Sequence, residues 1–314
     1  SERFPQMKNV IYIGQEKYRG MYNTAEILLL GSNIEDEELV EAKKKVTCHD
    51  VVNMQYTSGT TGFPKGVQLT HRNIANDGFW IGACQNLSCR DRVCIPVPLF
   101  HCFGCVLGVM SCVNHGSTMV FLEKFDPVQV MASIEKEKCT ATYGVPTMYI
   151  AMLDHPLFNR FDFTSLRTGI MSGSACPTHR MQQANDKMFM KEITNPYGLT
   201  EAGPVMTMTR YFETSIERKC QTIGQALPGI EVAIIDPETG EIAPIGENGE
   251  ICCRGFNTMR GYYKMPEQTA KCIDENGWLH SGDIGRMDAD GYYYITGRLK
   301  DLIIRGRENI SPKE

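Results

Sequence analysis

The stretch YTSGTTGFPKG, residues 56–66, contains four serine or threonine hydroxyls, three glycines, one proline and one lysine. It follows a run of strand-forming residues, 51–56, so the backbone N–H groups of the loop are free to bind a ligand. Glycine lets a ligand approach the backbone closely, the hydroxyls are hydrogen-bond donors, and Lys65 adds a mobile positive charge. This combination predicts a loop that binds a polyphosphate.

Two other interpretations start from the same residues. A Walker-type phosphate loop needs glycine before its lysine and serine or threonine after it, whereas here Pro64 precedes Lys65 and Gly66 follows it. The loop therefore does not match that class of nucleotide-binding protein. A flexible surface turn remains compatible with the loop, and only motifs elsewhere in the chain can decide against it.

The composition of the 314-residue chain is that of a globular protein, with 42% hydrophobic and 22% charged residues. The net charge is −5, and no basic block is interleaved with aromatics, so nucleic acid is disfavoured as a partner. The longest apolar run, residues 103–113, is far shorter than the ~20 residues that cross a bilayer. We therefore expect a buried helix there and no transmembrane segment.

The cysteines indicate a reducing compartment. There are 13 of them, an odd number at irregular spacings, which is typical of free thiols. Cys102 and Cys105 form a C-x-x-C pair without a second pair at zinc-ligand spacing, so two packed thiols are expected. Free thiols fit the cytoplasm, which we expect as the compartment, and the mitochondrial matrix equally. Since the chain begins without methionine and stops soon after an apolar run, 301–304, we expect a fragment.

The order of elements predicts an α/β fold. Between residues 34 and 200, short β-branched runs alternate with helical segments, which favours a mostly parallel sheet covered by helices. Helices are expected after Thr70 and after Asp126, an N-cap followed by Pro127. From about residue 217, turn dipeptides punctuate short strands and predict a small antiparallel β subdomain. The strands predicted for the α/β part are 51–56, 92–97, 117–122, 140–143, 166–171 and 192–195.

Further motifs follow the loop in order: PLFHCFG (98–104), GSACP (173–177), NPYGLTE (195–201), GEICCRG (249–255), GWLHSGDIG (277–285) and GRLKDLIIRGRENISP (297–312). Together with the loop they resemble the adenylate-forming, AMP-binding superfamily, which includes acyl-CoA synthetases, firefly luciferase and peptide-synthetase adenylation domains. The stretches CHDVVNMQYTSGTTG (48–62) and YGVPTMYIAML (143–153) are most similar to its medium-chain fatty acyl-CoA ligases. These motifs, in this order, argue against a plain surface turn at residues 56–66.

The resemblance implies a fold and a domain division. The chain would form the large N-terminal domain of the adenylate-forming fold, with the C-terminal lid absent. Residues 1–216 would be an α/β AMP-binding core that is incomplete at its N-terminus, and residues 217–296 a β-rich subdomain. Residues 297–314 would be the hinge, with Lys300 at its centre, and the start of a truncated C-terminal domain.

The resemblance also implies a reaction and its cofactors. A carboxylate attacks the α-phosphorus of ATP and releases pyrophosphate, and the thiol of coenzyme A then displaces AMP from the acyl-adenylate. ATP, Mg²⁺ and coenzyme A are therefore the expected partners, with a medium- or long-chain fatty acid as substrate. The fragment itself would turn over poorly, because the lid supplies a catalytic lysine. A peptide-synthetase-type adenylation domain and a catalytically silent nucleotide-binding module are the alternatives.

Site residues follow from the resemblance, position by position. Lys65, Thr200 and Glu201 would be catalytic: Lys65 at the β- and γ-phosphates, Thr200 at the α-phosphate, and Glu201 as the Mg²⁺ ligand. The rest of the phosphate loop would be Thr57, Ser58, Gly59, Thr60, Thr61 and Gly62.

The nucleoside would bind elsewhere in the motifs. Tyr197 would stack on adenine, Asn195 would meet its amino edge, and Asp283 would accept both ribose hydroxyls with Arg298 near the same sugar. The remaining residues assigned to this site are Gly173, Ser174, Ala175 and Gly198.

The acyl group is predicted to lie near His101. Amino-acid-activating relatives usually carry aspartate at this position, so histidine favours a carboxylic acid without an α-ammonium group. Apolar candidates for the acyl tunnel are Phe103, Ile170 and Met171, although each of them could equally be ordinary core.

Overall fold

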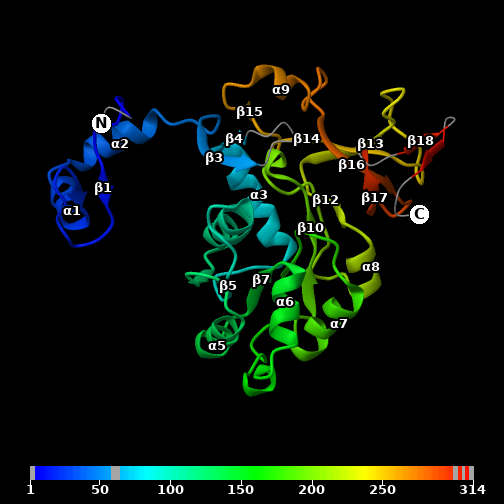
Figure 1. The fold of residues 1–314 in the computed structure, drawn as a ribbon, viewed down its shortest axis with the longest axis horizontal. Helices are drawn as coiled ribbons and strands as arrows, with labels where there is room; N and C mark the ends of the chain where they lie inside the picture. Colours follow the sequence, from blue (N-terminus) through cyan, green and yellow to red (C-terminus); the bar gives the residue numbers. More distant parts are fainter. Residues whose placement is uncertain (1–3, 58–63, 300–302, 306–307, 311–314) are drawn as a thin grey trace. The chain divides into compact units, whose positions relative to one another are not determined.

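The computed structural model describes residues 4–57, 64–299, 303–305 and 308–310, in two compact units, Ser1–Asp50 and Val51–Glu314. The first unit contains a parallel pair of short strands, β1 (Ile11–Tyr12) and β2 (Tyr22–Asn23), followed by two helices, α1 (Thr24–Gly31) and α2 (Asp36–Lys44) (Figure 1). Asn23 caps α1, because its side chain accepts the Glu26 N–H at 2.9 Å and the Glu26 carboxylate accepts the Asn23 N–H at 3.0 Å.

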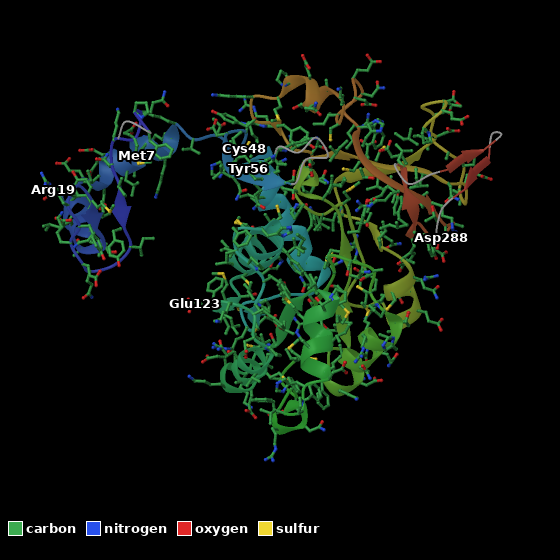
Figure 2. All side chains as sticks on the ribbon, viewed as in Figure 1. Met7, Arg19, Cys48, Tyr56, Glu123 and Asp288 are labelled. Carbon is green, nitrogen blue, oxygen red and sulfur yellow. The ribbon has the colours of Figure 1, made fainter. Side chains whose placement is uncertain are left out.

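The second unit begins with a β-hairpin around the predicted phosphate loop. Strand β3 (Val51–Thr57) pairs antiparallel with β4 (Lys65–Thr70), and Thr57 faces Lys65 across the pair. A short strand, β15 (Gly261–Tyr262), adds to the other side of β4. Figure 2 marks Tyr56 near the carboxyl end of β3, where the loop sequence starts.

The hairpin corrects one prediction. We expected residues 51–56 in the parallel sheet, but β3 belongs to the separate sheet β15-β4-β3. The loop between β3 and β4 is short, and a short loop can join only antiparallel neighbours, since a parallel pair needs a long crossover. Strand β4 was not predicted either, although Val67 and Leu69, both 0% exposed, alternate with more exposed Gln68 in a strand pattern.

The predicted parallel sheet is confirmed. Five strands lie in the order β6-β5-β7-β8-β9, and every neighbouring pair is parallel. They are β5 (Arg92–Ile95), β6 (Thr118–Phe121), β7 (Ala141–Gly144), β8 (Thr168–Met171) and β9 (Glu192–Thr194).

Successive residues of these strands enter different apolar cores, as the two-residue period of a strand requires. Val93 and Ile95 pack on one face of the sheet, while Cys94 packs on the other. The first core includes residues of α3 (His71–Cys84), of the π-helix η1 (Phe103–Met110) and of α4 (Ser111–His115). The second includes residues of α5 (Pro127–Glu137), α6 (Pro146–Leu153) and α7 (Thr178–Lys187).

The helices begin where the sequence predicted. The Thr70 hydroxyl accepts the Asn73 N–H at the start of α3, and the Asp126 carboxylate accepts the Gln129 N–H at the start of α5, with Pro127 in the first turn. The apolar run from residue 103 is helical as expected, but its first eight residues wind as a π-helix. No helix in the described part of the chain is both long and apolar enough to cross a membrane.

The C-terminal part is antiparallel, as predicted. Its four-stranded sheet has the order β13-β14-β16-β17, and the turn after β16 carries Asp288, which is labelled in Figure 2. These strands are β13 (Ile230–Ile235), β14 (Gly249–Gly255), β16 (Leu279–Met287) and β17 (Tyr293–Arg298). The division at residues 216 and 296 stays a prediction.

Shorter elements complete the unit. A small antiparallel sheet is formed by β10 (Pro196–Tyr197), β11 (Thr207–Met208) and β12 (Gln225–Ala226), and a separate pair by β18 (Ile303–Arg305) and β19 (Glu308–Ile310). The remaining helices are η2 (Phe158–Arg160), η3 (Thr200–Ala202), α8 (Ile216–Gln221) and α9 (Pro266–Ala270).

Candidate functional site

A cavity of about 540 Å³ opens beyond the carboxyl ends of β8 and β9. Ligands of parallel α/β sheets bind at this edge, because loops there converge while the strands themselves supply the core. Residues from β10, β16 and β17 close the other side of the cavity. All eight residues predicted for the nucleoside line it: Gly173, Ser174, Ala175, Asn195, Tyr197, Gly198, Asp283 and Arg298.

Three of these side chains are joined by one hydrogen bond and one ion pair. The Tyr197 hydroxyl donates to Asp283 Oδ2 at 2.7 Å, and Arg298 Nε lies 3.2 Å from Asp283 Oδ1. Burial, together with the negative charge of Asp283, raises the pKa of Tyr197, so its hydroxyl stays a donor. Each carboxylate oxygen retains a second lone pair, so Asp283 can still accept two further hydroxyls.

The orientation of Asn195 is fixed by its neighbours. Its side-chain nitrogen donates to the carbonyl of Lys219 at 3.1 Å and more weakly to that of Thr222 at 3.4 Å. Both partners are acceptors, so the amide oxygen takes the remaining direction. A ligand that meets Asn195 in the cavity therefore finds an acceptor, which is what an exocyclic amino group requires.

Gly198 is required by packing next to Tyr197. A Cβ atom at this position would lie 2.1 Å from the carbonyl oxygen of Pro204, a backbone atom that cannot move aside. The glycine therefore lets the chain after β10 pass close to the segment that follows η3.

The three predicted catalytic residues are not among those that line this cavity. Lys65 begins β4, and Thr200 and Glu201 are the first two residues of η3. Glu201 is buried, and its Oε1 accepts a hydrogen bond from the Tyr262 hydroxyl at 2.8 Å. The Lys65 Nζ lies over the ring of the same tyrosine, 4.7 Å from its centroid.

Glu201 fits a hard cation such as Mg²⁺. Among the described residues no hydrogen bond reaches its Oε2, so one oxygen of a buried carboxylate is left for a ligand. Carboxylate oxygens are the protein ligands that Mg²⁺ prefers, usually one or two of them with water and phosphate. The donor set therefore agrees with the predicted role.

The other predicted residues are placed as follows. Thr57 ends β3, whereas Ser58, Gly59, Thr60, Thr61, Gly62 and Lys300 lie outside the described residues. His101 is exposed; its Nδ1 accepts the Phe103 N–H at 3.0 Å, and partial burial of the ring lowers its pKa.

Of the apolar candidates, Phe103 and Ile170 pack in the core on the α3 side of the sheet. Met171 packs in the opposite core, because neighbouring residues of a strand point to opposite faces. Ile170 and Met171 therefore lie on opposite faces of the sheet and do not line the same space. The role of each in an acyl tunnel stays a prediction.

Two residues that support Asp283 were not predicted from the sequence. Glu250 Oε1 accepts the Gly282 N–H at 2.8 Å, and Glu250 Oε2 pairs with His280 Nδ1 at 2.7 Å. The pKa of His280 is raised, chiefly by this hydrogen bond. The motifs GEICCRG and GWLHSGDIG already indicated the region, but not that Glu250 holds the irregular part of β16 immediately before Asp283.

Glu250, Cys252 and His280 present ligand-type atoms within 4.8 Å of one another. Both Glu250 oxygens are occupied by protein donors, and the Cys252 Sγ lies 3.4 Å from His280 Nδ1. This cluster is therefore a hydrogen-bonded support for β16.

Comparison with known proteins places these features in context. The model of the family described as AMP-binding enzyme matches residues 10–263. YngI of Bacillus subtilis, provisionally named an acyl-CoA synthetase, is 52% identical over 314 residues, covering 100% of this chain and 57% of YngI. The mitochondrial medium-chain acyl-CoA ligase ACSF2 of Danio rerio is 42% identical over 317 residues, covering 100% of this chain and 52% of ACSF2.

This chain is also similar to a solved structure. The O-succinylbenzoate coenzyme A synthetase MenE of Bacillus subtilis, in complex with ATP and a magnesium ion, has a TM-score of 0.75 and 31% identity. The match covers 85% of this chain and 54% of MenE. This chain thus spans about half the length of the curated relatives it matches.

Proposed function

Because this chain belongs to the AMP-binding enzyme family, we propose that it forms the nucleotide-binding core of an ATP-dependent carboxylate–CoA ligase. The observation that carries the proposal is the shared cavity of Tyr197, Asn195 and Asp283. These residues come from separate segments and offer a flat ring, an amide acceptor and a carboxylate. That combination suits adenine, its amino group and the ribose hydroxyls.

The phosphate-binding residues suit the proposed chemistry. A carboxylate that attacks a triphosphate brings two anions together, so the protein must neutralise charge and align the reactants. Lys65 provides a half-buried ammonium group at the end of the loop, and Thr200 provides a hydroxyl. Mg²⁺ held by Glu201 would neutralise phosphate charge.

For the substrate we propose a medium- or long-chain fatty acid. The name of the Danio rerio relative, a medium-chain acyl-CoA ligase, supports the shorter range. His101 offers no carboxylate to pair with an α-ammonium group, which counts against an adenylation domain of the peptide-synthetase type. The cytoplasm remains the proposed compartment, with the mitochondrial matrix as the alternative; all 13 cysteines are free, as in a reducing environment.

Two experiments test the proposal in order. Isothermal titration calorimetry with AMP and with ATP asks first whether the chain binds the nucleotide, and we expect both to bind. The full-length protein, with the lid that supplies the catalytic lysine, is then given ATP, Mg²⁺, coenzyme A and either saturated fatty acids of graded length or a set of amino acids. We expect AMP and acyl-CoA to appear together with fatty acids.

The outcomes separate the candidates. Aminoacyl-adenylate as the only product would indicate an adenylation domain instead of a carboxylate–CoA ligase. Nucleotide binding by the full-length protein without any product from any acid would support a silent binding module. The Lys65→Gln variant controls for contaminating ligase, because its product formation must fall below that of the unaltered protein.

A further inference from the structure

Tyr262 lies on the strand next to Lys65. Strand β15 pairs with β4 so that Tyr262 faces Val67, and Lys65 stands two residues before Val67 on the same face of β4. Diagonal neighbours of this kind lie within reach of long and aromatic side chains. The backbone also connects the strands beyond this pair, since the Tyr263 N–H donates to the Gly66 carbonyl at 2.8 Å.

The same side chain reaches Glu201 in a different part of the fold. The tyrosine hydroxyl donates to Glu201 Oε1 at 2.8 Å, although the two residues are 61 positions apart. The segment that carries Glu201 is fixed independently, because the Met259 N–H donates to the Glu201 carbonyl at 2.9 Å. Tyr262 is 7% exposed, so its ring has little freedom to leave this position.

Tyr262 thus stands between two groups of opposite charge. The Lys65 ammonium lies over the ring face, 4.7 Å from the centroid, where the negative side of the ring quadrupole attracts a cation. Among the described residues no ion pair joins Lys65 to Glu201 directly. Burial and the charge of Glu201 raise the pKa of Tyr262, so the hydroxyl remains a donor.

An ion pair between Lys65 and Glu201 would neutralise both groups before any ligand arrived. The ring prevents this loss, because it offers the ammonium a weak partner that phosphate oxygens can displace. The hydroxyl meanwhile occupies one oxygen of Glu201, while no hydrogen bond among the described residues reaches the other.

We propose that Tyr262 is a positioning residue that keeps Glu201 oriented for Mg²⁺ and Lys65 available for the β- and γ-phosphates of ATP. This inference rests on the proposed function, because it needs nucleotide to bind at this site. Tyr262 does not itself contact the reacting atoms in this scheme, so its substitution acts through Glu201 and Lys65.

The test measures binding, with Tyr262→Phe and Tyr262→Leu compared to the unaltered protein. Three affinities are determined by calorimetry: AMP, ATP in EDTA, and ATP with excess Mg²⁺. The phenylalanine variant loses only the hydroxyl. The factor by which Mg²⁺ increases the affinity for ATP should therefore be at least about fivefold smaller than in the unaltered protein. Its affinities for AMP and for ATP in EDTA should stay unchanged.

The leucine variant also removes the ring, so its affinity for ATP in EDTA should be lower than that of the unaltered protein. Its affinity for AMP, which lacks the β- and γ-phosphates, should be unchanged. Tyr263→Phe is the matched control, since the ring of this exposed neighbour lies against Lys264 rather than against Lys65 or Glu201. An unchanged Mg²⁺ effect in Tyr262→Phe would overturn the inference, as would equal losses for all three ligands, which indicate a general packing defect. Absence of AMP and ATP binding in the unaltered protein would instead overturn the proposed function.

Discussion

Asp283 and Arg298 are direct cross-strand partners in β16 and β17, and Arg298 Nε lies 3.2 Å from Asp283 Oδ1. The two side chains differ sharply in exposure: 73% for Arg298 and 16% for Asp283. An exposed ion pair contributes only ~0–1 kcal/mol, because water screens it. The carboxylate is therefore the partner on which nucleotide binding should depend.

Asp283→Asn should weaken AMP and ATP binding alike by about tenfold, because hydrogen bonds to a charged acceptor are worth ~1.5–3 kcal/mol. Arg298→Gln should cost no more than about fivefold. Calorimetric titration of both nucleotides checks this. The matched control is Asp290→Asn, which removes another exposed aspartate–arginine pair of the same region. A larger loss in Arg298→Gln than in Asp283→Asn would contradict the assignment.

Lys65→Gln should distinguish ATP from AMP. The substitution removes one ammonium group from the end of the phosphate loop, so ATP affinity should fall about tenfold while AMP affinity stays the same. Lys264→Gln is the control, since Lys264 likewise lies over a tyrosine ring, that of Tyr263, but is fully on the surface. Equal weakening of AMP would show that Lys65 does not act on the outer phosphates.

Asp77 should make the protein less stable as pH rises. Its side chain is 0% exposed, and only Oδ2 has a partner, the Val205 N–H at 3.0 Å; burial raises its pKa well above the ordinary value. A raised folded-state pKa means that its stability contribution is complete below the unfolded pKa near ~3.9 and declines above it. Asp77→Asn should remove this decline.

Urea unfolding at pH 4, 6 and 8 measures the effect. The stability of Asp77→Asn relative to the unaltered protein should increase with pH. Asp77→Ala, which leaves the Val205 N–H without its partner, should be less stable than the unaltered protein by ~1–3 kcal/mol at pH 4. This deficit should shrink as pH rises, because alanine also removes the group that titrates. A constant difference between Asp77→Asn and the unaltered protein would show that Asp77 keeps one protonation state throughout.

The Glu250–His280 pair should have a pH dependence of its own. The pKa of His280 is raised, mainly by the hydrogen bond to Glu250, so its contribution is complete below the unfolded pKa near ~6.5. It is lost as pH rises through the folded-state pKa. The stability difference between the unaltered protein and His280→Gln should therefore shrink between pH 6 and pH 9, measured by urea unfolding. His49→Gln, at an exposed position, should show no such trend.

The sequence predicted the parallel sheet because its strands carry β-branched runs between helices with clear N-caps. The sequence did not predict the sheet to which β3 belongs, nor the strand β4. The strand pattern of residues 51–56 was visible, but the strand that pairs with it was not. Val51–Thr57 has apolar residues at exposed positions and Gln55 buried, the reverse of an ordinary half-buried strand. Burial here depends on what surrounds the hairpin, which a strand period alone does not encode.

The candidate site divides in the same way. The residues of the nucleoside cavity could be assigned because each belongs to a short motif whose residue types match a ligand group. Glu250, His280 and Tyr262 could not. Glu250 acts through contacts with His280 and Gly282 on the neighbouring strand, and Tyr262 through contacts with Glu201 and Lys65, which are far from it in sequence.

The amino-acid sequence by itself determined which chemical groups are available and in what order, since the identity of a side chain fixes its charge and donors. The tertiary structure decided which of these groups meet: the cavity of Tyr197 and Asp283, and the tyrosine ring between Lys65 and Glu201. The physical reason is that hydrogen bonds and cation–π contacts act over a few ångströms, and only packing of the whole chain sets those distances.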